Sequence, residues 1–408
     1  MLKELSIEEF TNFSRNHNLG NFHQTIEYAL LRTEEGFEYE LIGYYLEDTL
    51  KAASLILYKK INNYYYGYAP RGFLIDYSNK QLLKTFTEEI IKYYQQKSFI
   101  FIKINPEIAI GTVNQDTKSI THNQNYNITH NLIENGYKKL KDNLYFEALL
   151  PRMNVIIPLN KFSLENISKN TRNKVKKGIR KGLTLHKADN DQFPTLYEFI
   201  KNIRNKDELY YKDLVNVFDK NDSIDLFLVK VDFKNYLINS QAKYNEEMTQ
   251  NTNLNDKIMK DNKSTNLNAK MNSDKKLLTY KNDITEASKN LNTTEDLYIA
   301  GALVIKYENR ITIQISGYDK NYKRYSPNYF LYYAILDYYK ATYKYADLNG
   351  ITADFSANNP YHGLNRFKIG FNPDIYEYIG EYDLIINQKA YNNLLKNGTL
   401  AKEFNKQN

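Results

Sequence analysis

The chain has 408 residues, of which 42% are hydrophobic and 25% charged, and its 55 lysines and arginines outnumber 48 acidic residues to give a formal net charge of +7. This length exceeds what one hydrophobic core usually serves, so we expect two folded domains and exclude fibrous and disordered classes. Because the chain has no cysteine and its first residues lack the apolar stretch of a secretion signal, disulfides are excluded and a cytoplasmic protein is expected.

The first half of the chain predicts strands, a helix and a further strand. Apolar runs on both sides of a polar turn predict a β-hairpin within 38–63, and a third strand follows over 63–69. Apolar residues recur at helical spacing in 79–95, and 99–104 is a β-branched and aromatic strand that ends before Pro106. Strands, helix and strand in this order indicate an α/β layer.

A loop rich in Asn, Thr and Gln is expected over 111–127, followed by a short helix over 128–136. The second half repeats the theme after a strand at 154–159, with further helices and strands expected over 191–203, 225–231, 299–307, 310–317 and 327–343. We therefore predict an α/β (α+β) fold with two similar domains, 1–150 and 151–384.

Residues 240–294 interrupt the second half without a glycine or a proline. Their sparse apolar side chains lie at helix-compatible intervals around a polar stretch that begins at Asp261. We predict an antiparallel helical hairpin here, a coiled-coil arm that projects from the second domain. A disordered low-complexity insertion is the alternative.

The segment 168–182 carries seven cations and no acidic residue. A solvated helical face usually interleaves acids for i,i+4 pairing, so this pattern favours an anionic partner such as phosphate or nucleic acid over a merely soluble face. Aromatic residues are missing from the run, so base stacking is not indicated there. The candidate nucleic-acid-binding residues are Lys169, Arg172, Lys174, Lys176, Lys177 and Arg180.

Two further segments combine turn signals with a cation. Tyr68–Gly72 puts Arg71 in a tight turn between a strand and a helix, from which it could reach a substrate or pair with a carboxylate. Asn359–Pro373 is expected to be a loop that carries Phe367 and Lys368, and without further context Lys368 is interpreted as a surface residue.

Missing motifs narrow the chemistry. No Gly-x-Gly-x-x-Gly, Gly-x-x-x-x-Gly-Lys-Ser/Thr or Gly-x-Ser-x-Gly pattern occurs, so dinucleotide, P-loop and serine-elbow functions have no support. The six histidines show no metal spacing and cysteine is absent, so a metal site is not expected. Chemistry without metal or cofactor, or binding alone, remains.

Six segments, taken in chain order, resemble the Fem family of non-ribosomal peptidyl transferases, which includes FemA, FemB and FemX. Each match is weak alone, but six in the family's order over nearly the whole chain are specific. The matching segments are Phe22–Gly36, Tyr68–Tyr77, Phe101–Pro106, Thr171–Lys177, Gly363–Phe371 and Glu377–Asp383.

The resemblance implies two tandem acetyltransferase-like (GNAT-like) domains, with residues from about 385 to 408 packing back on the first. It implies transfer of an amino acid from aminoacyl-tRNA to the stem-peptide amine of a lipid-linked peptidoglycan precursor, lipid II, at the inner membrane face. It implies no cofactor and no metal. No apolar run approaches the roughly 20 residues that span a bilayer, so membrane contact is expected to be peripheral.

The same resemblance assigns the reacting site. The family's lysine that holds the precursor's phosphates falls on Arg32, and its catalytic aromatic-lysine pair falls on Phe367 and Lys368. Lys368 suits stabilisation of the oxyanion that forms when the amine attacks the ester. We expect Arg32, Phe367 and Lys368 at the rim of one groove, and the basic helix and the arm in contact with tRNA.

Arg71, Asn105 and Tyr211 complete the expected substrate site, with two departures from the family pattern. Asn105 stands where the family commonly has an aspartate before Pro106, so a carboxylate near the acceptor amine is missing, and Asp213 stands where an arginine is expected. Two alternatives remain open: a tRNA-dependent transferase with a different acceptor, and a non-catalytic nucleic-acid-binding protein. A binding protein has no reason to bring Arg32 and Lys368 to one groove.

Overall fold

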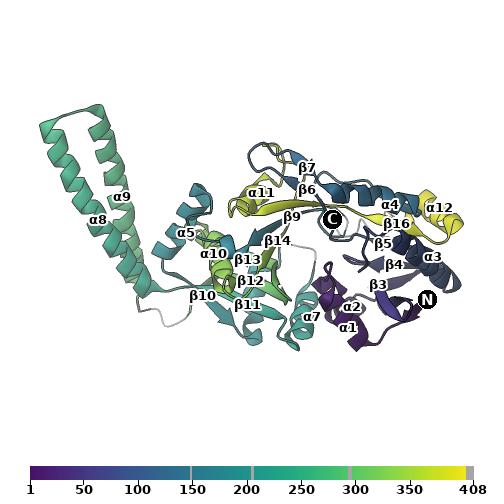
Figure 1. Ribbon diagram of the computed structural model, residues 1–408. Coiled ribbons are helices and arrows are strands. Elements are labelled where there is room, and N and C mark those ends of the chain that lie inside the picture. Colours follow the sequence, from purple (N-terminus) through teal and green to yellow (C-terminus); the bar gives the residue numbers. More distant parts are fainter. Residues whose placement is uncertain (148, 204–205, 293–295, 401–408) are drawn as a thin grey trace.

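The structure of the chain is a computed structural model that describes residues 1–147, 149–203, 206–292 and 296–400. Two mixed β-sheets carry helices on their faces, and a pair of long helices projects from the second sheet (Figure 1). The predicted α/β class is confirmed.

The first sheet has seven strands in the order β1-β2-β3-β4-β5-β16-β8, and all neighbours are antiparallel except β4 and β5. The predicted hairpin is formed by β2 and β3, which turn at Glu47 and Asp48 with positive φ angles of 47° and 57°, as tight hairpin turns require. The strands are Leu2–Glu4 (β1), Glu38–Leu46 (β2), Thr49–Ile61 (β3), Tyr64–Ala69 (β4), Phe99–Ile104 (β5), Tyr382–Ile385 (β16) and Tyr137–Lys139 (β8).

The second sheet has nine strands in the order β10-β11-β12-β13-β14-β9-β15-β6-β7, and again one neighbouring pair, β13 and β14, is parallel. The strands are Leu183–Ala188 (β10), Ile224–Val231 (β11), Tyr298–Tyr307 (β12), Arg310–Tyr318 (β13), Tyr345–Ile351 (β14), Met153–Pro158 (β9), Asp374–Tyr378 (β15), Ala109–Val113 (β6) and Ile120–His122 (β7).

A helix joins each parallel pair, because parallel neighbours need a crossover connection. α3 (Lys80–Gln96) connects β4 to β5, and α10 (Pro327–Tyr339) connects β13 to β14. α3 begins where the Asn79 side chain accepts the N–H of Leu82 at 3.0 Å, and its apolar positions are buried as their spacing predicts. The two sheets therefore repeat one pattern of strands and crossover helix.

Strands are exchanged between the two halves of the sequence. β6 and β7 extend the second sheet beyond β15, whereas β16 lies between β5 and β8 of the first sheet. The loop expected over 111–127 is wrong in part, because β6 pairs with β15 and with β7, so that 111–113 and 120–122 are strands. The sheets therefore do not divide at residue 150, and the domains 1–150 and 151–384 remain a prediction.

The C-terminal helix α12 (Gln388–Lys396) lies against the first sheet. The Tyr391 ring is 5.4 Å from the ring of Phe101 on β5, and its hydroxyl donates to Asp383 at 2.7 Å. Asp383 also accepts from Lys103 at 2.8 Å, which compensates the burial of a lysine in a central strand. Residues 401–408 lie outside the described residues.

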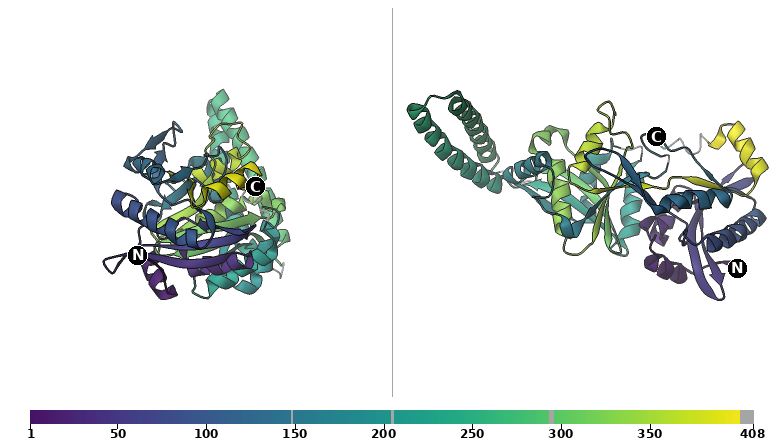
Figure 2. Two further views of the ribbon diagram at one scale, coloured as in Figure 1. Left: turned by 90° about the vertical axis from the view of Figure 1, so that its right-hand side faces the viewer. Right: turned by 45° about the horizontal axis from the view of Figure 1, so that its top comes forward.

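The arm consists of α8 (Phe233–Lys260) and α9 (Ser264–Lys289), which run side by side and connect the adjacent strands β11 and β12 (Figures 1 and 2). It starts earlier than the expected 240–294, and residues 293–294 lie outside the described range. Its interior is polar: Asn251 Nδ2 donates to Ser273 Oγ at 2.9 Å. In the described part of the chain no helix is both long and apolar enough to cross a membrane.

Three of the remaining helices were not expected from the sequence: α1 (Ile7–Asn16), α7 (Glu208–Asp219) and α11 (His362–Ile369). The helices expected over 191–203 and 327–343 end earlier, at Ile200 and Tyr339. The other helices are α2 (Ile26–Glu34), α4 (Ile128–Glu134), α5 (Lys169–Arg180) and α6 (Phe193–Ile200).

Candidate functional site

Side chains from both sheets meet in a largely buried polar group, here called the seam cluster. The seam cluster comprises Arg71, Asn105, Glu107, Arg310, Asp347 and Tyr378. Arg71 has a φ of 53°, and its N–H donates to Asn105 Oδ1 at 2.9 Å. Its guanidinium donates to the Pro151 carbonyl at 2.9 Å and lies 5.1 Å from the Tyr378 ring. Two residues from separate sequence motifs, Arg71 and Asn105, are thus brought together.

Glu107 lies at the centre of the seam cluster. Its carboxylate pairs with Arg310, accepts from Asn21, and accepts from the Tyr378 hydroxyl at 3.0 Å. Burial raises the pKa of Glu107, but the guanidiniums of Arg310 and Arg71 outweigh that effect and hold the pKa below its ordinary value. A carboxylate is therefore present two residues beyond Asn105, although the sequence indicated that one was missing.

Asp347 is the second carboxyl group of the seam cluster. It is buried on β14, where it accepts from Asn154 Nδ2 at 3.2 Å and from the N–H of Asn349 at 2.7 Å. Burial raises the pKa of Asp347 above its ordinary value, despite the opposing charge of Arg310. The seam cluster therefore contains one carboxyl group with a lowered pKa and one with a raised pKa.

An irregular turn of β14 connects the seam cluster to Lys368. Pairing of β14 with β9 shifts register between Asp347 and Gly350, and Asn349 has a φ of 68°. The Gly350 carbonyl then accepts a hydrogen bond from Lys368 Nζ at 2.7 Å. A Cβ atom at Gly350 would lie 2.2 Å from that of Pro151, so only glycine allows this close approach.

Lys368 and Phe367 lie on helix α11 and are buried, so the expected loop and surface reading are wrong. The Phe367 ring lies 4.9 Å from Tyr329 and 4.8 Å from Tyr332, so the aromatic packing of α10 holds α11 in place. The turn signals misled the sequence analysis because a two-turn helix is stabilised here by tertiary packing more than by its own propensity.

Arg32 lies at the interface of α2 with α7, where it is also buried. Its guanidinium pairs with Glu35 at 2.5 Å and lies 4.7 Å from the Phe37 ring. Lys206 from the second half pairs with the same Glu35. Burial and the nearby Arg32 lower the pKa of Lys206 to about 8.

His23 lies close to several positive charges. Burial lowers its pKa well below the ordinary value, and the charges of Arg71, Arg32 and Arg310 lower it further. Three arginines from distant parts of the sequence therefore generate one positive region around His23. Lys206 lies at its Arg32 end, on the same carboxylate of Glu35.

Tyr211 is buried on α7 in the core shared by α2 and α7, with the Tyr210 ring 5.2 Å away. Asp213 is half-buried on the same helix. The structure therefore brings Arg32 and Tyr211 to one interface, and Arg71 and Asn105 to the seam cluster. Helices α2 and α11, which carry Arg32 and Lys368, lie apart in both Figure 1 and Figure 2.

The predicted basic segment forms α5, and its cations have different surroundings. Lys169 and Lys176 are exposed, and the described part of the chain offers them no hydrogen bond or ion pair. Arg180 and Lys181 instead pair with Asp283 of the arm at 3.2 and 2.7 Å. The local sequence lacks acidic residues, and the acid that pairs with Lys181 lies more than 100 positions away in the chain.

Two of the other cations of α5 donate hydrogen bonds within the protein. Arg172 donates to the Glu165 carbonyl at 3.0 Å, and Lys174 donates to the Tyr329 hydroxyl at 2.9 Å. Burial and the charges of Lys181 and Arg180 lower the pKa of Lys177.

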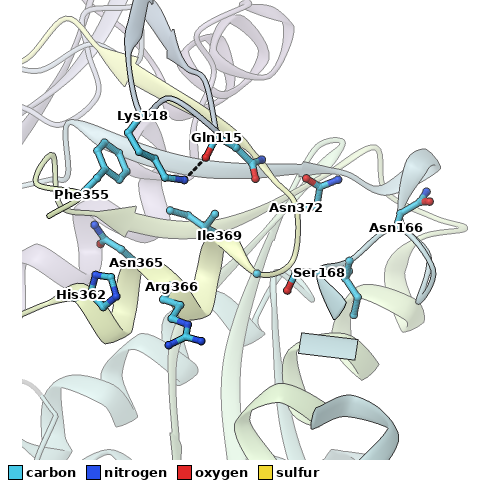
Figure 3. Close-up of a pocket in the computed structure, with 12 residues that line it drawn as sticks. Gln115, Lys118, Asn166, Ser168, Phe355, His362, Asn365, Arg366, Ile369 and Asn372 are labelled. Carbon is cyan, nitrogen blue, oxygen red and sulfur yellow. Dashed lines mark hydrogen bonds between the residues drawn. The ribbon is translucent and has the colours of Figure 1, made fainter. Parts of the chain in front are cut away.

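A cavity of about 430 Å³ opens beside α11 (Figure 3). Gln115 and Lys118 of the turn between β6 and β7 lie on one side, and His362, Asn365 and Ile369 of α11 lie on the other. The segment before α5 completes it with Asn166, Ile167 and Ser168. The cavity is on the face of α11 opposite to Phe367 and Lys368, and neither of these nor Arg32 lines it.

Sequence reasoning missed Glu107, Arg310, Asp347 and Lys206. No spacing relates these positions, and the only signal was the carboxylate next to the Asn105-Pro106 pair. Among the described residues, no three acidic or histidine side chains are grouped in a way that could hold a metal ion. The site residues available for chemistry are therefore cations, carboxylates and amides.

Comparison with known proteins places this arrangement in a family. The sequence profile of the FemAB family matches residues 5–396. A lipid II:glycine glycyltransferase of Staphylococcus aureus is 23% identical over 94% of this chain and 92% of its own length, and its counterpart in strain NCTC 8325 is equally similar. The crystal structure of FemX matches 96% of this chain and 99% of its own, with a TM-score of 0.74 and 22% identity. The FemAB profile spans nearly the whole chain, and the fold agrees with that of FemX. This protein therefore belongs to the FemAB family and is an aminoacyltransferase.

Proposed function

We propose that the protein moves an amino acid from aminoacyl-tRNA to the stem-peptide amine of lipid II and so builds the interpeptide bridge of peptidoglycan. The observation that carries this proposal is the FemAB match over residues 5–396, together with the relative named lipid II:glycine glycyltransferase. The ester of the donor is already activated, so the reaction needs alignment of two substrates and a cation near the developing oxyanion.

We assign the phosphates of the acceptor to the positive region around His23. Arg32 and Lys206 share one carboxylate there, that of Glu35, so a pyrophosphate can take the place of Glu35 between them. A bidentate guanidinium suits this role, which the family gives to a lysine. The two cations come from opposite halves of the chain, so acceptor binding also bridges α2 and the segment before α7.

We assign acyl transfer to the region between the seam cluster and α11. The hydrogen bond to Gly350 orients the Lys368 ammonium, and Phe367 fixes the helix that carries it. Asp347 is a carboxyl group with a raised pKa on the same irregular turn, so it is suited to take the proton from the attacking amine. The products are an amide and a tRNA whose terminal ribose carries a free hydroxyl group.

Purified protein incubated with radiolabelled aminoacyl-tRNA pools and lipid II in detergent micelles tests the proposal. Label is expected to move to the lipid fraction, and ribonuclease treatment of the donor beforehand is expected to abolish the transfer. Binding of tRNA without any transfer to lipid II would favour a non-catalytic binding protein. Transfer to a protein N-terminus but not to lipid II would identify a tRNA-dependent transferase with a different acceptor.

A further inference from the structure

One outer edge of the second sheet differs from the other sheet edges. The outer backbone groups of an edge strand are unpaired, and proteins commonly protect such an edge by keeping the strand short or by placing a bulge or a proline in it. The edge strands β1, β8 and β7 have three residues each, whereas β10 has six. β10 pairs with β11 in one regular register and contains no proline. It is the longest edge strand in the described part of the chain, and it lies at the base of the arm (Figure 1).

The backbone of β10 presents three residues to this edge. In an antiparallel pair, residues that bond to the neighbouring strand alternate with residues whose N–H and C=O point away from it. The N–H of Asp232 donates to the Gly182 carbonyl at 2.8 Å, so Gly182 and every second residue after it bond to β11. Leu183, Leu185 and Lys187 therefore turn their backbone groups outward, where no other described strand pairs with them.

A cavity of about 330 Å³ lies beside the same residues, between β10 and helix α10. Leu185 and Lys187 line it together, because strand residues two positions apart point to one face of the sheet. The remaining lining is mainly aromatic and comes from β11 and from one stripe of α10 at helical spacing. These residues are Phe227, Phe330, Tyr333, Ala334, Asp337 and Tyr338. Tyr338 is 52% exposed, so this aromatic wall is accessible from solvent.

The lysine of β10 does not guard the edge in the usual way. An edge-strand lysine commonly prevents pairing with another chain, because its charge would be buried there. Lys187 Nζ instead pairs at 2.9 Å with Asp225, a buried residue of β11. The charge of Lys187 is therefore compensated within the protein and does not oppose the approach of a further strand.

We propose that β10 and the cavity beside it bind an extended segment of a partner protein, which adds a strand to the second sheet. The main chain of this segment pairs with the outward groups of Leu183, Leu185 and Lys187, and one of its apolar side chains enters the cavity beside Tyr338. A row of amide donors and carbonyl acceptors is matched by another extended polypeptide, and the cavity selects the side chains at every second position. The segment therefore has apolar residues that alternate with polar ones.

Selection of linear peptides from a random phage-displayed library on the full-length protein tests the proposal without any transfer reaction. Enriched peptides are expected to alternate apolar and polar residues. Their affinity, measured by fluorescence anisotropy of the synthetic peptides, is expected to fall about tenfold in two variants. Ala334→Trp fills the cavity, and Leu185→Pro removes an outward N–H, which an edge strand tolerates. Leu185→Val keeps that N–H and His186→Ala changes the opposite face, so both controls are expected to bind like the wild type.

Hydrogen exchange separates strand addition from binding in the cavity alone. A bound peptide is expected to slow exchange of the outward amides of Leu185 and Lys187. The amide of His186 already bonds to β11, so its exchange is expected to change less.

Three results would overturn the inference: no peptide enriched on the wild-type protein over Ala334→Trp, equal affinity in the wild type and both variants, or unchanged exchange of the Leu185 and Lys187 amides. Sedimentation of the protein alone adds a fourth, because a dimer that dissociates in both variants would make a second copy of this chain the occupant of the edge. Thermal midpoints of all variants exclude unfolding as the cause of lost binding. Each outcome is independent of whether label reaches lipid II, so the proposed function and this surface stand or fail separately.

Discussion

Helix α5 and its C-cap residue carry cations in two different surroundings. Lys169 and Lys176 are exposed and unpaired among the described residues, whereas Arg180 and Lys181 both pair with Asp283 of the arm, and Lys181 also pairs with Glu286. Only cations without acidic partners can bind a polyanion by release of its counterions. A run of positive charge in the sequence therefore combines two groups of cations here, an exposed unpaired group and a group that anchors the arm.

Helix α11 repeats the contrast between its two faces. Lys368 is buried and donates to the Gly350 carbonyl, whereas Arg366 is exposed at a cavity. The difference shows that burial separates cations that are paired within the protein from cations that remain open to solvent. Each of the following changes tests one side of this comparison.

The largest effect on stability is expected from Lys181→Ala. Its side chain is only 5% exposed, and its removal leaves Asp283 and Glu286 with fewer partners in a buried place. We expect the free energy of unfolding to fall by about 3 kcal/mol, as for other broken buried ion pairs. Urea denaturation measures this change. Lys176→Ala on the exposed part of α5 is the control, with an expected change within about 0.5 kcal/mol, and equal losses in both variants would refute the comparison.

The largest effect on catalysis is expected from Lys368→Ala. If the ammonium stabilises the oxyanion as a single donor, turnover falls by roughly 100-fold while the apparent Michaelis constants change little. Arg366→Ala, which removes the exposed cation of the same helix, is expected to leave turnover nearly normal. Steady-state kinetics with both substrates varied separates the two. Normal turnover in Lys368→Ala would reduce this residue to a structural contact of β14.

The exposed part of α5 is tested by replacing Lys169 and Lys176 together with alanine. Each lost phosphate contact lowers the slope of log affinity against log salt by roughly 0.7 to 0.9, so the pair is expected to flatten it by about 1.5. Filter binding of tRNA at several salt concentrations measures the slope. An unchanged slope would mean that this surface is merely solvated and that tRNA is held elsewhere.

Shortening of the arm tests whether the stability of the protein depends on the anchored base of the arm and not on its outer part. Removal of residues 248–275 with a short connecting loop keeps Asp283 and Glu286 against α5, because Asn251 and Ser273 face each other across the hairpin. The free energy of unfolding is expected to change by less than about 1 kcal/mol, whereas the rate of transfer from tRNA falls. A strongly destabilised short-arm protein would show that the outer arm, too, supports the fold.

The smallest effect expected is a pH dependence of acceptor binding. The pKa of Lys206 is about 8, below its ordinary value, so this group loses its positive charge as the pH rises through 8. The apparent Michaelis constant for lipid II is therefore expected to rise above about pH 8. Arg32, Glu35, Asp207 and the Tyr210 ring surround the ammonium. Lys206→Met is expected to remove the pH dependence, and Arg32→Ala to raise the constant at every pH.

Local pattern predicted the elements better than the site. Apolar spacing placed α3, and the polar turn at Glu47 placed the β2–β3 hairpin. The helical pattern of α11 was missed because its turn signals are strong and its apolar positions are satisfied by Tyr329 and Tyr332 of another helix. Prediction succeeded where the stabilising contacts lie within a few residues.

The sequence by itself determined the α/β class, the repeated order of strands and crossover helix, the position of the arm and the family. Each of these depends on periodicity and motif order, which are readable along the chain. Only the tertiary structure decided which charged side chains are paired within the protein and which remain unpaired. Glu107 meets Arg310, and Lys181 meets Asp283, across 203 and 102 positions of sequence. Electrostatic pairing depends on distance through space, so residues that look alike in the sequence acquire different roles when the chain folds.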